Sequence, residues 1–254
     1  MGCYPLFCCE DWALLKGDIA AIAKDGPVSL VLVTDPFGNW TLPGLKEAFP
    51  DLCRPYKIHN VIDFTESTST ALDRNHMRNI RRALDHLNIA TLEDPSKHLS
   101  DWNGLYANLI ARHEITGVSA FSAESFELQF EIPGLWAFAA RQGDEIVGMT
   151  LWYQQGDSAY YHLGAYSDAG YALSASFGIF WTAIEFFRRK GLKRLDLGAG
   201  LDPQGTDGLA RFKRGWANTE CPVYLCGRIL DPGAYALLAT TSGNDPAYFP
   251  TYRS

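Results

Sequence analysis

Two hairpin turns, followed by one long amphipathic helix and a short strand, constrain the fold of this 254-residue chain more than any other feature. The apolar and aromatic runs at 136–141, 145–154 and 159–166 are separated by two Gln-Gly-Asp turns, a pattern typical of an antiparallel meander. A helix should follow, because large apolar residues recur at three- and four-residue steps from Phe177 to Phe187. Since this helix of about 14 residues leads into a strand at 194–198, a right-handed crossover is favoured, with the strands before and after it parallel.

Several motifs in and around this region carry a family resemblance. They are the tyrosine-rich strand at 160–165, the small-residue loop at 167–176, Leu-Asp-Leu-Gly at 195–198, a fragment at 102–122, and Gly208–Trp216 with its Phe-Lys-x-x-Trp sequence. Together they resemble GNAT-type acyltransferases over roughly residues 56–230. In detail they are similar to the FemAB-like branch, whose members include aminoacyl-tRNA-dependent enzymes that append residues to peptidoglycan precursors and small peptides.

The resemblance implies an α/β fold with a GNAT-like mixed, mainly antiparallel sheet, flanking helices and a preceding abbreviated GNAT-like lobe. We predict an abbreviated N-terminal α/β lobe at 1–70, a basic linker helix at 71–98, a GNAT-like acyltransferase domain at 99–240 and an irregular tail at 241–254. Within these, helices are expected at 11–25, 42–49, 72–88 and 99–111 and after an N-cap at Ser122, with further strands at 28–34, 56–64 and 223–230.

One departure from the family pattern concerns the acyl donor. Acetyl-CoA-dependent relatives carry an Arg/Gln-x-x-Gly-x-Gly/Ala loop after the fourth strand, and residues 167–176 do not match it. Small residues at a helix N-terminus can nevertheless present backbone N–H groups to a phosphate. Asp168 would repel a phosphate that it faced; alternatively, it is a helix cap or an exposed turn residue. The predicted donor-binding residues are Ser167, Gly170, Ser174, Ser176 and Arg214.

The catalytic predictions start from what acyl transfer to an amine requires: positioning, proton removal and stabilisation of an oxyanion. The resemblance implies that Lys213 reaches the donor, and we expect its side chain to leave the buried face that Phe212 and Trp216 share. Asp196 lies in a short central strand and either orients a reacting group or makes a structural hydrogen bond. His162 titrates in the range of a proton acceptor, although a core histidine is the commoner outcome.

The acceptor is expected near the loop at 112–117, which overhangs the acceptor cleft in the resembled fold. Arg112, His113 and Tyr161 are the predicted acceptor-binding residues, with a structural role left open for the first two. Tyr161 and His162 are neighbours in a strand, so they should lie on opposite faces of the sheet. The sequence shows no nucleophile motif and no metal-ligand spacing, and we predict neither a metal nor a tightly bound cofactor.

The charge pattern bears on the partners. The net charge of −7 argues against coating nucleic acid non-specifically, yet 12 of the 22 Lys and Arg residues fall within 74–82, 188–194 and 211–214. The arginines at 74, 78 and 81 or 82 follow one face of the helix expected at 72–88, where they either bind phosphates in bidentate fashion or form a solvated face. The basic segments and the missing loop favour a tRNA donor, whereas the acidic balance and short chain favour a thioester.

Cysteine usage and the absence of targeting signals indicate location. The six cysteines form no C-x-x-C pair, the first residues lack the pattern of a signal peptide, and no apolar run is long enough to span a membrane. We therefore expect a cytoplasmic N-acyltransferase without membrane association. It would join an acyl or aminoacyl group, carried by the co-substrate aminoacyl-tRNA or acyl-CoA, to an amine of a small molecule or peptide. The alternative is a non-catalytic ligand- or tRNA-binding module that kept the cleft.

Overall fold

The computed structural model describes residues 9, 11–66, 72–201, 205–241 and 248–253. They form two compact units. Unit 1 contains Met1–His59, Leu201–Gly205 and Glu220–Ser254, and unit 2 contains Asn60–Gly200 and Thr206–Thr219.

Unit 1 is built on the strand pair β1 (Ser29–Val33) and β8 (Thr219–Ile229), which is antiparallel with Ser29 opposite Ile229. Its core is apolar because helices α1 (Leu15–Ile22) and α2 (Leu42–Ala48) contribute Ile19 and Leu45 to a cluster that includes Leu32 of β1. The remaining elements of unit 1 are η1 (Ala23–Asp25), the first part of β2 (Leu52–Asp63), α9 (Pro232–Thr241) and η4 (Thr251–Arg253).

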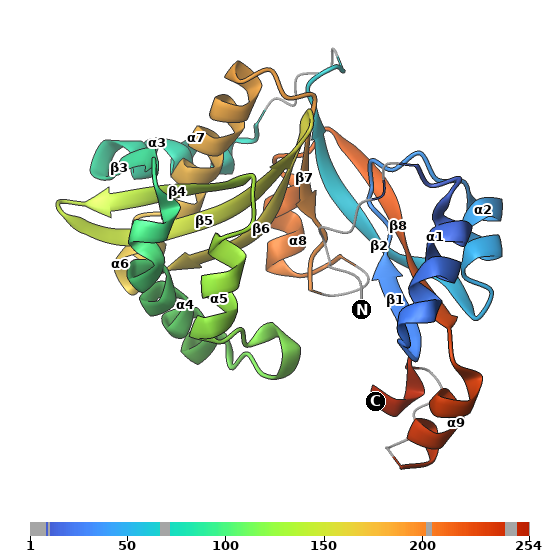
Figure 1. The fold of residues 1–254 in the computed structure, drawn as a ribbon. Helices are drawn as coiled ribbons and strands as arrows, with labels where there is room; N and C mark the ends of the chain where they lie inside the picture. Colours follow the sequence, from blue (N-terminus) through green and yellow to red (C-terminus); the bar gives the residue numbers. More distant parts are fainter. Residues whose placement is uncertain (1–8, 10, 67–71, 202–204, 242–247, 254) are drawn as a thin grey trace. The chain divides into compact units, whose positions relative to one another are not determined.

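Unit 2 contains the predicted meander and crossover. The end of β2 is followed in hydrogen-bonded order by β7 (Arg194–Gly198), β6 (Ser158–Tyr166), β5 (Glu145–Gln155), β4 (Leu135–Gln142) and β3 (Asn88–Thr91). The full order is β1-β8-β2-β7-β6-β5-β4-β3, traced in Figure 1. Among the registers described for these strands, β6 with β7 is parallel and the others are antiparallel. The predicted mixed, mainly antiparallel α/β fold is confirmed.

The two hairpins of the meander turn on glycine. Gly143 and Gly156 have φ angles of 62° and 56°, in the left-handed region that residues with a Cβ rarely adopt. Each follows the Gln of a Gln-Gly-Asp turn, so the register β4-β5-β6 is set by the turn chemistry recognised in the sequence.

Helices cover both faces of the unit 2 sheet. Successive residues of β4, such as Phe138 and Ala139, belong to different apolar clusters, because they point to opposite faces of the sheet. The first cluster packs against α3 (Arg74–His86), α7 (Ala175–Arg189) and α8 (Gly208–Arg214). The second packs against α4 (Leu99–His113) and α5 (Ala123–Phe130). Short helices η2 (Pro95–His98), η3 (Gly117–Ser119) and α6 (Asp168–Ala172) complete the unit.

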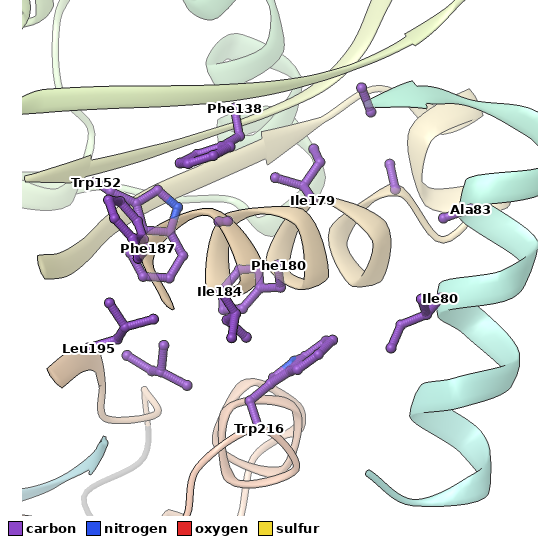
Figure 2. Close-up of a cluster of buried hydrophobic side chains, with 14 of the residues drawn as sticks. Ile80, Ala83, Phe138, Trp152, Ile179, Phe180, Ile184, Phe187, Leu195 and Trp216 are labelled. Carbon is purple, nitrogen blue, oxygen red and sulfur yellow. The ribbon is translucent and has the colours of Figure 1, made fainter. Parts of the chain in front are cut away.

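Helix α7 is the centre of the first cluster. Figure 2 shows Phe180, Ile184 and Phe187 of this helix between the sheet residues Phe138 and Trp152 on one side and Trp216 on the other. Complete burial of an aromatic or large aliphatic side chain contributes about 1.5–3 kcal/mol, so the three- and four-residue spacing that predicts the helix also anchors it.

The compact units divide the chain differently from the sequence-based boundaries. Helix α3, predicted within a linker at 71–98, supplies Ile80 and Ala83 to the first cluster, and the predicted tail starts within α9. Strand β8, assigned from the sequence to the end of the acyltransferase domain, pairs with β1. The division into 1–70, 71–98, 99–240 and 241–254 stays a prediction about domain organisation.

Candidate active site

The parallel strands β6 and β7 separate soon after they begin. The described register joins Ser158, Ala159 and Tyr160 to Arg194, Leu195 and Asp196 and ends there. Strand β6 then continues to Tyr166 along β5, while β7 ends at Gly198. The two strands therefore diverge beyond the Tyr160–Asp196 pair, and the residues that follow on each strand border the gap in the hydrogen-bonded ladder.

Lys213 lies at this divergence. Its helix α8 begins at the N-cap Asp207, whose carboxylate accepts a hydrogen bond from Ala210 N. Nζ of Lys213 donates to the carbonyl oxygen of Ala199, just after β7, at 2.7 Å, and it lies 5.3 Å from the ring centroid of Tyr161 on β6. With 6 % exposure the side chain is buried; it does not leave the buried face as the sequence led us to expect. Its ammonium group thus lies between the segment that follows β7 and the Tyr161 ring of β6.

Asp196 holds the end of β7, next to the segment that Lys213 contacts. Its side chain is 1 % exposed, and Oδ1 accepts a hydrogen bond from Gly198 N at 2.7 Å. Asn60 Nδ2 donates to the Gly198 carbonyl at 3.2 Å. Gly198 itself has φ 71°, and a Cβ on it would lie 3.3 Å from Nζ of Lys213. Asp196 thus shapes the segment on which the lysine rests, which is the structural alternative left open for it.

Tyr161 shares the Lys213 side of the sheet. Its ring packs against Trp152 and Phe180, with centroids 5.2 and 4.8 Å apart. Its hydroxyl and that of Tyr166 lie 2.6 and 2.9 Å from where a Cβ on Gly164 would be. Burial raises the pKa of both phenols. Both groups are therefore neutral at physiological pH and able to donate hydrogen bonds.

His162 lies on the opposite face, as the strand alternation predicts. In the β5–β6 register Leu151 faces Leu163 and Trp152 faces Tyr161, which makes His162 the extra residue of a β-bulge. Its ring packs near Tyr153 and Phe121. The structure therefore brings Lys213, Asp196 and Tyr161 to one place and sets His162 apart from them.

The hydrogen bonds of His162 fix its tautomer. Gln129 Nε2 donates to Ser125 Oγ at 3.0 Å, so Gln129 Oε1, 2.7 Å from His162 Nε2, must accept from the ring. Nδ1 then carries the lone pair, and among the described residues this buried atom has no hydrogen-bond partner. Burial lowers the pKa of His162 to about 4, so the imidazole is neutral at physiological pH.

Several small residues of the predicted donor loop have structural roles in the fold. Ser167 caps α6 by accepting from Gly170 N at 3.2 Å. A Cβ on Gly170 would lie 2.0 Å from the Val147 carbonyl oxygen, so glycine lets α6 approach β5. Ser174 precedes α7 with φ 59° and donates to Asn79 Oδ1 at 3.3 Å. Ser176 lies half-buried in the first turn of α7, and Arg214 is exposed on α8.

The predicted acceptor residues lie at the end of α4. Arg112 forms an ion pair with Asp168, Nη1 to Oδ1 at 3.0 Å, and its guanidinium group lies 4.3 Å from the ring centroid of Tyr171. This pairing neutralises the carboxylate that would oppose a phosphate at the loop. His113 is the exposed last residue of the helix. The binding roles of Arg112 and His113 stay predictions.

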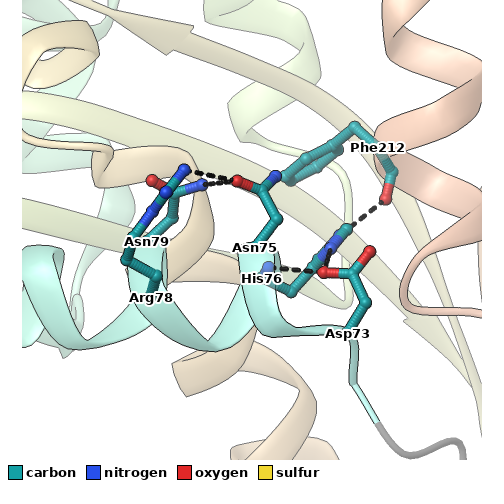
Figure 3. A network of polar contacts seen from close by, with 6 residues as sticks. All are labelled: Asp73, Asn75, His76, Arg78, Asn79 and Phe212. Carbon is teal, nitrogen blue, oxygen red and sulfur yellow. Dashed lines mark hydrogen bonds and ion pairs between the residues drawn. The ribbon is translucent and has the colours of Figure 1, made fainter.

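His76 lies on α3, the helix whose arginines the sequence places on one face, and it was not itself predicted as a site residue. It is 4 % exposed, with Nδ1 3.1 Å from Asp73 Oδ1 and Nε2 3.3 Å from the Phe212 carbonyl oxygen. Figure 3 shows the ring between α3 and α8. A Cβ on Gly215 would lie 2.0 Å from the imidazole, so the glycine after α8 makes room for it. The signal in the sequence is the four-residue step from His76 to the apolar Ile80.

Known families agree with this architecture. Residues 73–214 match the family model described as an acetyltransferase (GNAT) domain, which is more than half of the chain. The chain belongs to the GNAT family. The GNAT match begins next to α3 and ends with α8, so it takes in the diverging strands, Lys213 and His76 alike.

Solved structures of similar fold include members of the branch predicted from the sequence. The C-terminal domain of a protein described as a lysylphosphatidylglycerol synthetase from Agrobacterium fabrum has TM-score 0.62 and 17% identity, covering 91% of this chain and 77% of that one. FemX has TM-score 0.62 and 12% identity over 89% and 80%. L-PGS from Bacillus licheniformis has TM-score 0.52 and 15% identity over 69% and 61%. At these identities the likeness is one of fold, and the predicted GNAT-type, FemAB-like resemblance is confirmed at that level.

One further comparison and two structural observations complete the description of this GNAT protein. No curated protein matches the sequence. Among the described residues, no helix combines the length and the apolar character needed to cross a bilayer, and no group of three or more His, Cys, Asp or Glu side chains is placed to hold a metal ion.

Proposed function

We propose that this GNAT-family protein is an N-acyltransferase that moves an activated acyl or aminoacyl group to an amine of a small-molecule or peptide acceptor. The observation that carries the proposal is the buried ammonium group of Lys213 beside Ala199 and Tyr161, where β6 and β7 diverge. A positive charge is costly to bury, and it interacts strongly with a negative charge that develops nearby in a medium of low dielectric constant.

The proposed chemistry follows from the groups at the divergence. When an amine attacks the donor carbonyl, the carbonyl oxygen gains negative charge, and the Lys213 ammonium and the neutral Tyr161 hydroxyl would stabilise it. Asp196 would act indirectly, because it holds Gly198 and so the segment that Lys213 contacts. His162 lies on the other face, apart from Lys213 and Tyr161, so the proton-acceptor role predicted for it stays a prediction.

For the donor and the acceptor we propose classes of molecule and the residues that bind them. Aminoacyl-tRNA and acyl-CoA both remain within the proposal as co-substrates, since the fold is shared with FemX and the family is that of GNAT acetyltransferases. Ser167, Gly170, Ser174, Ser176 and Arg214 are the proposed donor side, and Arg112 and His113 the acceptor side. The cytoplasmic location expected from the sequence belongs to the same proposal.

The test is Lys213→Met, assayed with charged tRNAs and CoA thioesters against a panel of amines. Loss of the ammonium should lower turnover at least tenfold, which is about 1.4 kcal/mol of transition-state stabilisation. Arg211→Met is the matched control, because Arg211 is an exposed cation on the same helix and should leave turnover unchanged. Circular dichroism and thermal melting of both variants would show that α8 remains folded. Unchanged turnover in Lys213→Met would remove the assignment.

The alternative is a module that binds the donor without turning it over. It is favoured if the wild-type protein binds tRNA or CoA while no donor and amine pair in the panel yields product. In that case Lys213→Met should change donor affinity alone.

A further inference from the structure

Two cysteine thiols face each other in the core of unit 1. Cys53 lies near the start of β2 and Cys226 lies in β8, and these strands are neighbours in the sheet (Figure 1). Sγ of Cys226 donates a hydrogen bond to Sγ of Cys53 at a distance of 4.0 Å, and both are free thiols. The two residues are 173 positions apart in the sequence, so no local motif such as C-x-x-C marks them as a pair.

The strands hold both cysteine side chains on the core face of unit 1. Cys226 is opposite Leu32 of β1, and both belong to the apolar cluster against which Cys53 also packs. Just before β2, Asp51 Oδ2 accepts a hydrogen bond from Ile229 N at 2.8 Å. This contact lies two residues before one cysteine and three residues after the other. The strands therefore run antiparallel here, and the cysteines are nearly opposite each other.

The distance that separates the two sulfur atoms is one that side-chain rotation can close. A disulfide needs a sulfur–sulfur distance of about 2.05 Å and Cα atoms about 4.4–6.8 Å apart. Residues opposite each other on antiparallel strands have Cα atoms about 4.5–5.5 Å apart. The strand pairing thus meets the requirement on the backbone, and the side chains have only to turn toward each other.

The two thiols differ in their access to solvent. Cys226 is 0 % exposed, and burial, together with the neighbouring Cys53 thiol, raises its pKa. It therefore stays protonated at physiological pH and donates to the sulfur of Cys53. Cys53 is partly exposed, so of the two it is the one that solvent reaches. Since the accessible thiol is the one that an oxidant meets first, Cys53 is placed to react and Cys226 to follow.

We propose that Cys53 and Cys226 are a redox-responsive pair that a hydroperoxide oxidises to a disulfide. In the first step the Cys53 sulfur attacks a peroxide oxygen: an S–O bond forms, the O–O bond breaks, and the thiol and the hydroperoxide become a sulfenic acid and an alcohol, or water where the oxidant is hydrogen peroxide. In the second step the Cys226 sulfur attacks the sulfenic sulfur: the S–S bond forms, the S–O bond breaks, and the Cys226 proton leaves with the hydroxide as water. The electron pair that the sulfur atoms lose reduces the peroxide, and a dithiol reverses the change.

The disulfide joins chain segments that lie on either side of unit 2 in the sequence. Cys53 belongs to the first segment of unit 1, Met1–His59, and Cys226 to the last, Glu220–Ser254. The bond therefore closes a loop of chain that contains the whole of unit 2. Because closing a long loop restricts the unfolded chain, the oxidised protein should melt at a higher temperature than the reduced protein. In a reducing compartment such a bond is transient and reports the presence of oxidant.

The experiment treats the full-length protein with hydrogen peroxide under native conditions. The remaining thiols are blocked with N-ethylmaleimide, and the peptides are mapped by mass spectrometry with and without dithiothreitol. The expected result is a peptide pair joined through Cys53 and Cys226 that dithiothreitol separates. The proposal is overturned if both cysteines stay free at a peroxide concentration that oxidises glutathione, or if either is joined to another cysteine instead. This mapping needs no substitution, so the proposal stays testable where a variant does not fold.

Single substitutions test the order of the two steps. Cys226→Ala should leave a sulfenic acid on Cys53 that dimedone labels, and Cys53→Ala should protect the buried Cys226 from oxidation. Cys221→Ala is the matched control, because Cys221 is a partly exposed cysteine of the same strand, and this variant should cross-link like the wild type. Absence of the label from Cys53 in Cys226→Ala, or undiminished oxidation of Cys226 in Cys53→Ala, would contradict the proposal.

Melting temperatures test the consequence for the fold. Oxidation should raise the melting temperature of the wild type and of Cys221→Ala and leave that of Cys53→Ala unchanged. Equal melting temperatures for the oxidised and reduced wild-type protein would overturn the proposed effect of the bond. None of these measurements uses acyl transfer, so the inference goes beyond the proposed function and stands or fails separately from the test on Lys213.

Discussion

Nε2 of His76 lies 3.3 Å from the carbonyl oxygen of Phe212, the residue that precedes Lys213. The bond joins α3 to α8, and the imidazole also contacts the rings of Phe177 and Trp216, with centroids 5.1 Å away in each case. A polar residue in an aromatic cluster thus holds the helix that carries the proposed catalytic lysine.

We predict that His76→Leu lowers the free energy of unfolding by about 1–3 kcal/mol, because the half-buried Phe212 carbonyl would lose its partner while the side-chain volume is nearly kept. Urea denaturation measures the change. His86→Leu is the control on the same helix, since His86 is exposed and exposed substitutions stay within about 0.5 kcal/mol. Equal stability of the two variants would show that the Phe212 contact contributes nothing.

A second prediction concerns the packing of the proposed donor loop. Gly170→Ala would place a Cβ 2.0 Å from the Val147 carbonyl oxygen. This oxygen belongs to the backbone of β5, so it cannot move away without distorting the strand. The expected result is a loss of stability of about 1–3 kcal/mol, the usual cost of overpacking, and a displaced α6. Thermal melting measures the loss of stability, and the amide NMR shifts of the loop report the displacement of α6.

Gly104→Ala is the matched control for this change. Gly104 lies within α4, and a Cβ there meets no atom within 4 Å. Alanine should stabilise that helix by roughly 0.5–1 kcal/mol. Opposite signs for the two substitutions are expected, and a stabilising Gly170→Ala would mean that α6 does not pack against β5 as described.

The contrast between the two glycines shows what a sequence can and cannot predict here. The meander, the crossover helix and the capped helix after Ser122 were predictable because turn residues, three- and four-residue periodicity and N-caps are local signals. The pairing of β8 with β1 was not, since it joins Ser29 to Ile229 across most of the chain. A four-residue strand such as β3 and the weakly patterned α9 also carry too little periodicity to be recognised.

The same distinction applies to the candidate site. Lys213 was singled out from its motif. Its burial, however, depends on Ala199 and Tyr161, which both lie outside its own helix, so the motif alone does not indicate it. His76 was not recognised as a buried residue because its partner carbonyl is 136 residues away. The opposite faces of Tyr161 and His162 followed from the strand period alone, whereas the bulge that places His162 is visible only in the register.

The last prediction uses the buried imidazole of His162. Burial lowers its pKa to about 4, whereas in the unfolded chain it titrates near its ordinary value of about 6.5. Between these values the unfolded chain binds more protons than the folded protein. The stability should therefore fall as the pH drops through this window, with a slope from this residue of at most about 1.4 kcal/mol per pH unit. The slope from this residue is halved at about pH 6.5 and disappears above roughly pH 7.5, where the unfolded chain no longer binds the proton.

His162→Gln isolates that slope, because glutamine can still donate to Gln129 but does not titrate in this range. Urea denaturation from pH 4 to 7 should show a shallower pH dependence for the variant than for the wild-type protein, and contributions from the other histidines cancel in the comparison. Parallel pH profiles would mean that the ring titrates alike in the folded and unfolded states, as a solvent-exposed histidine would.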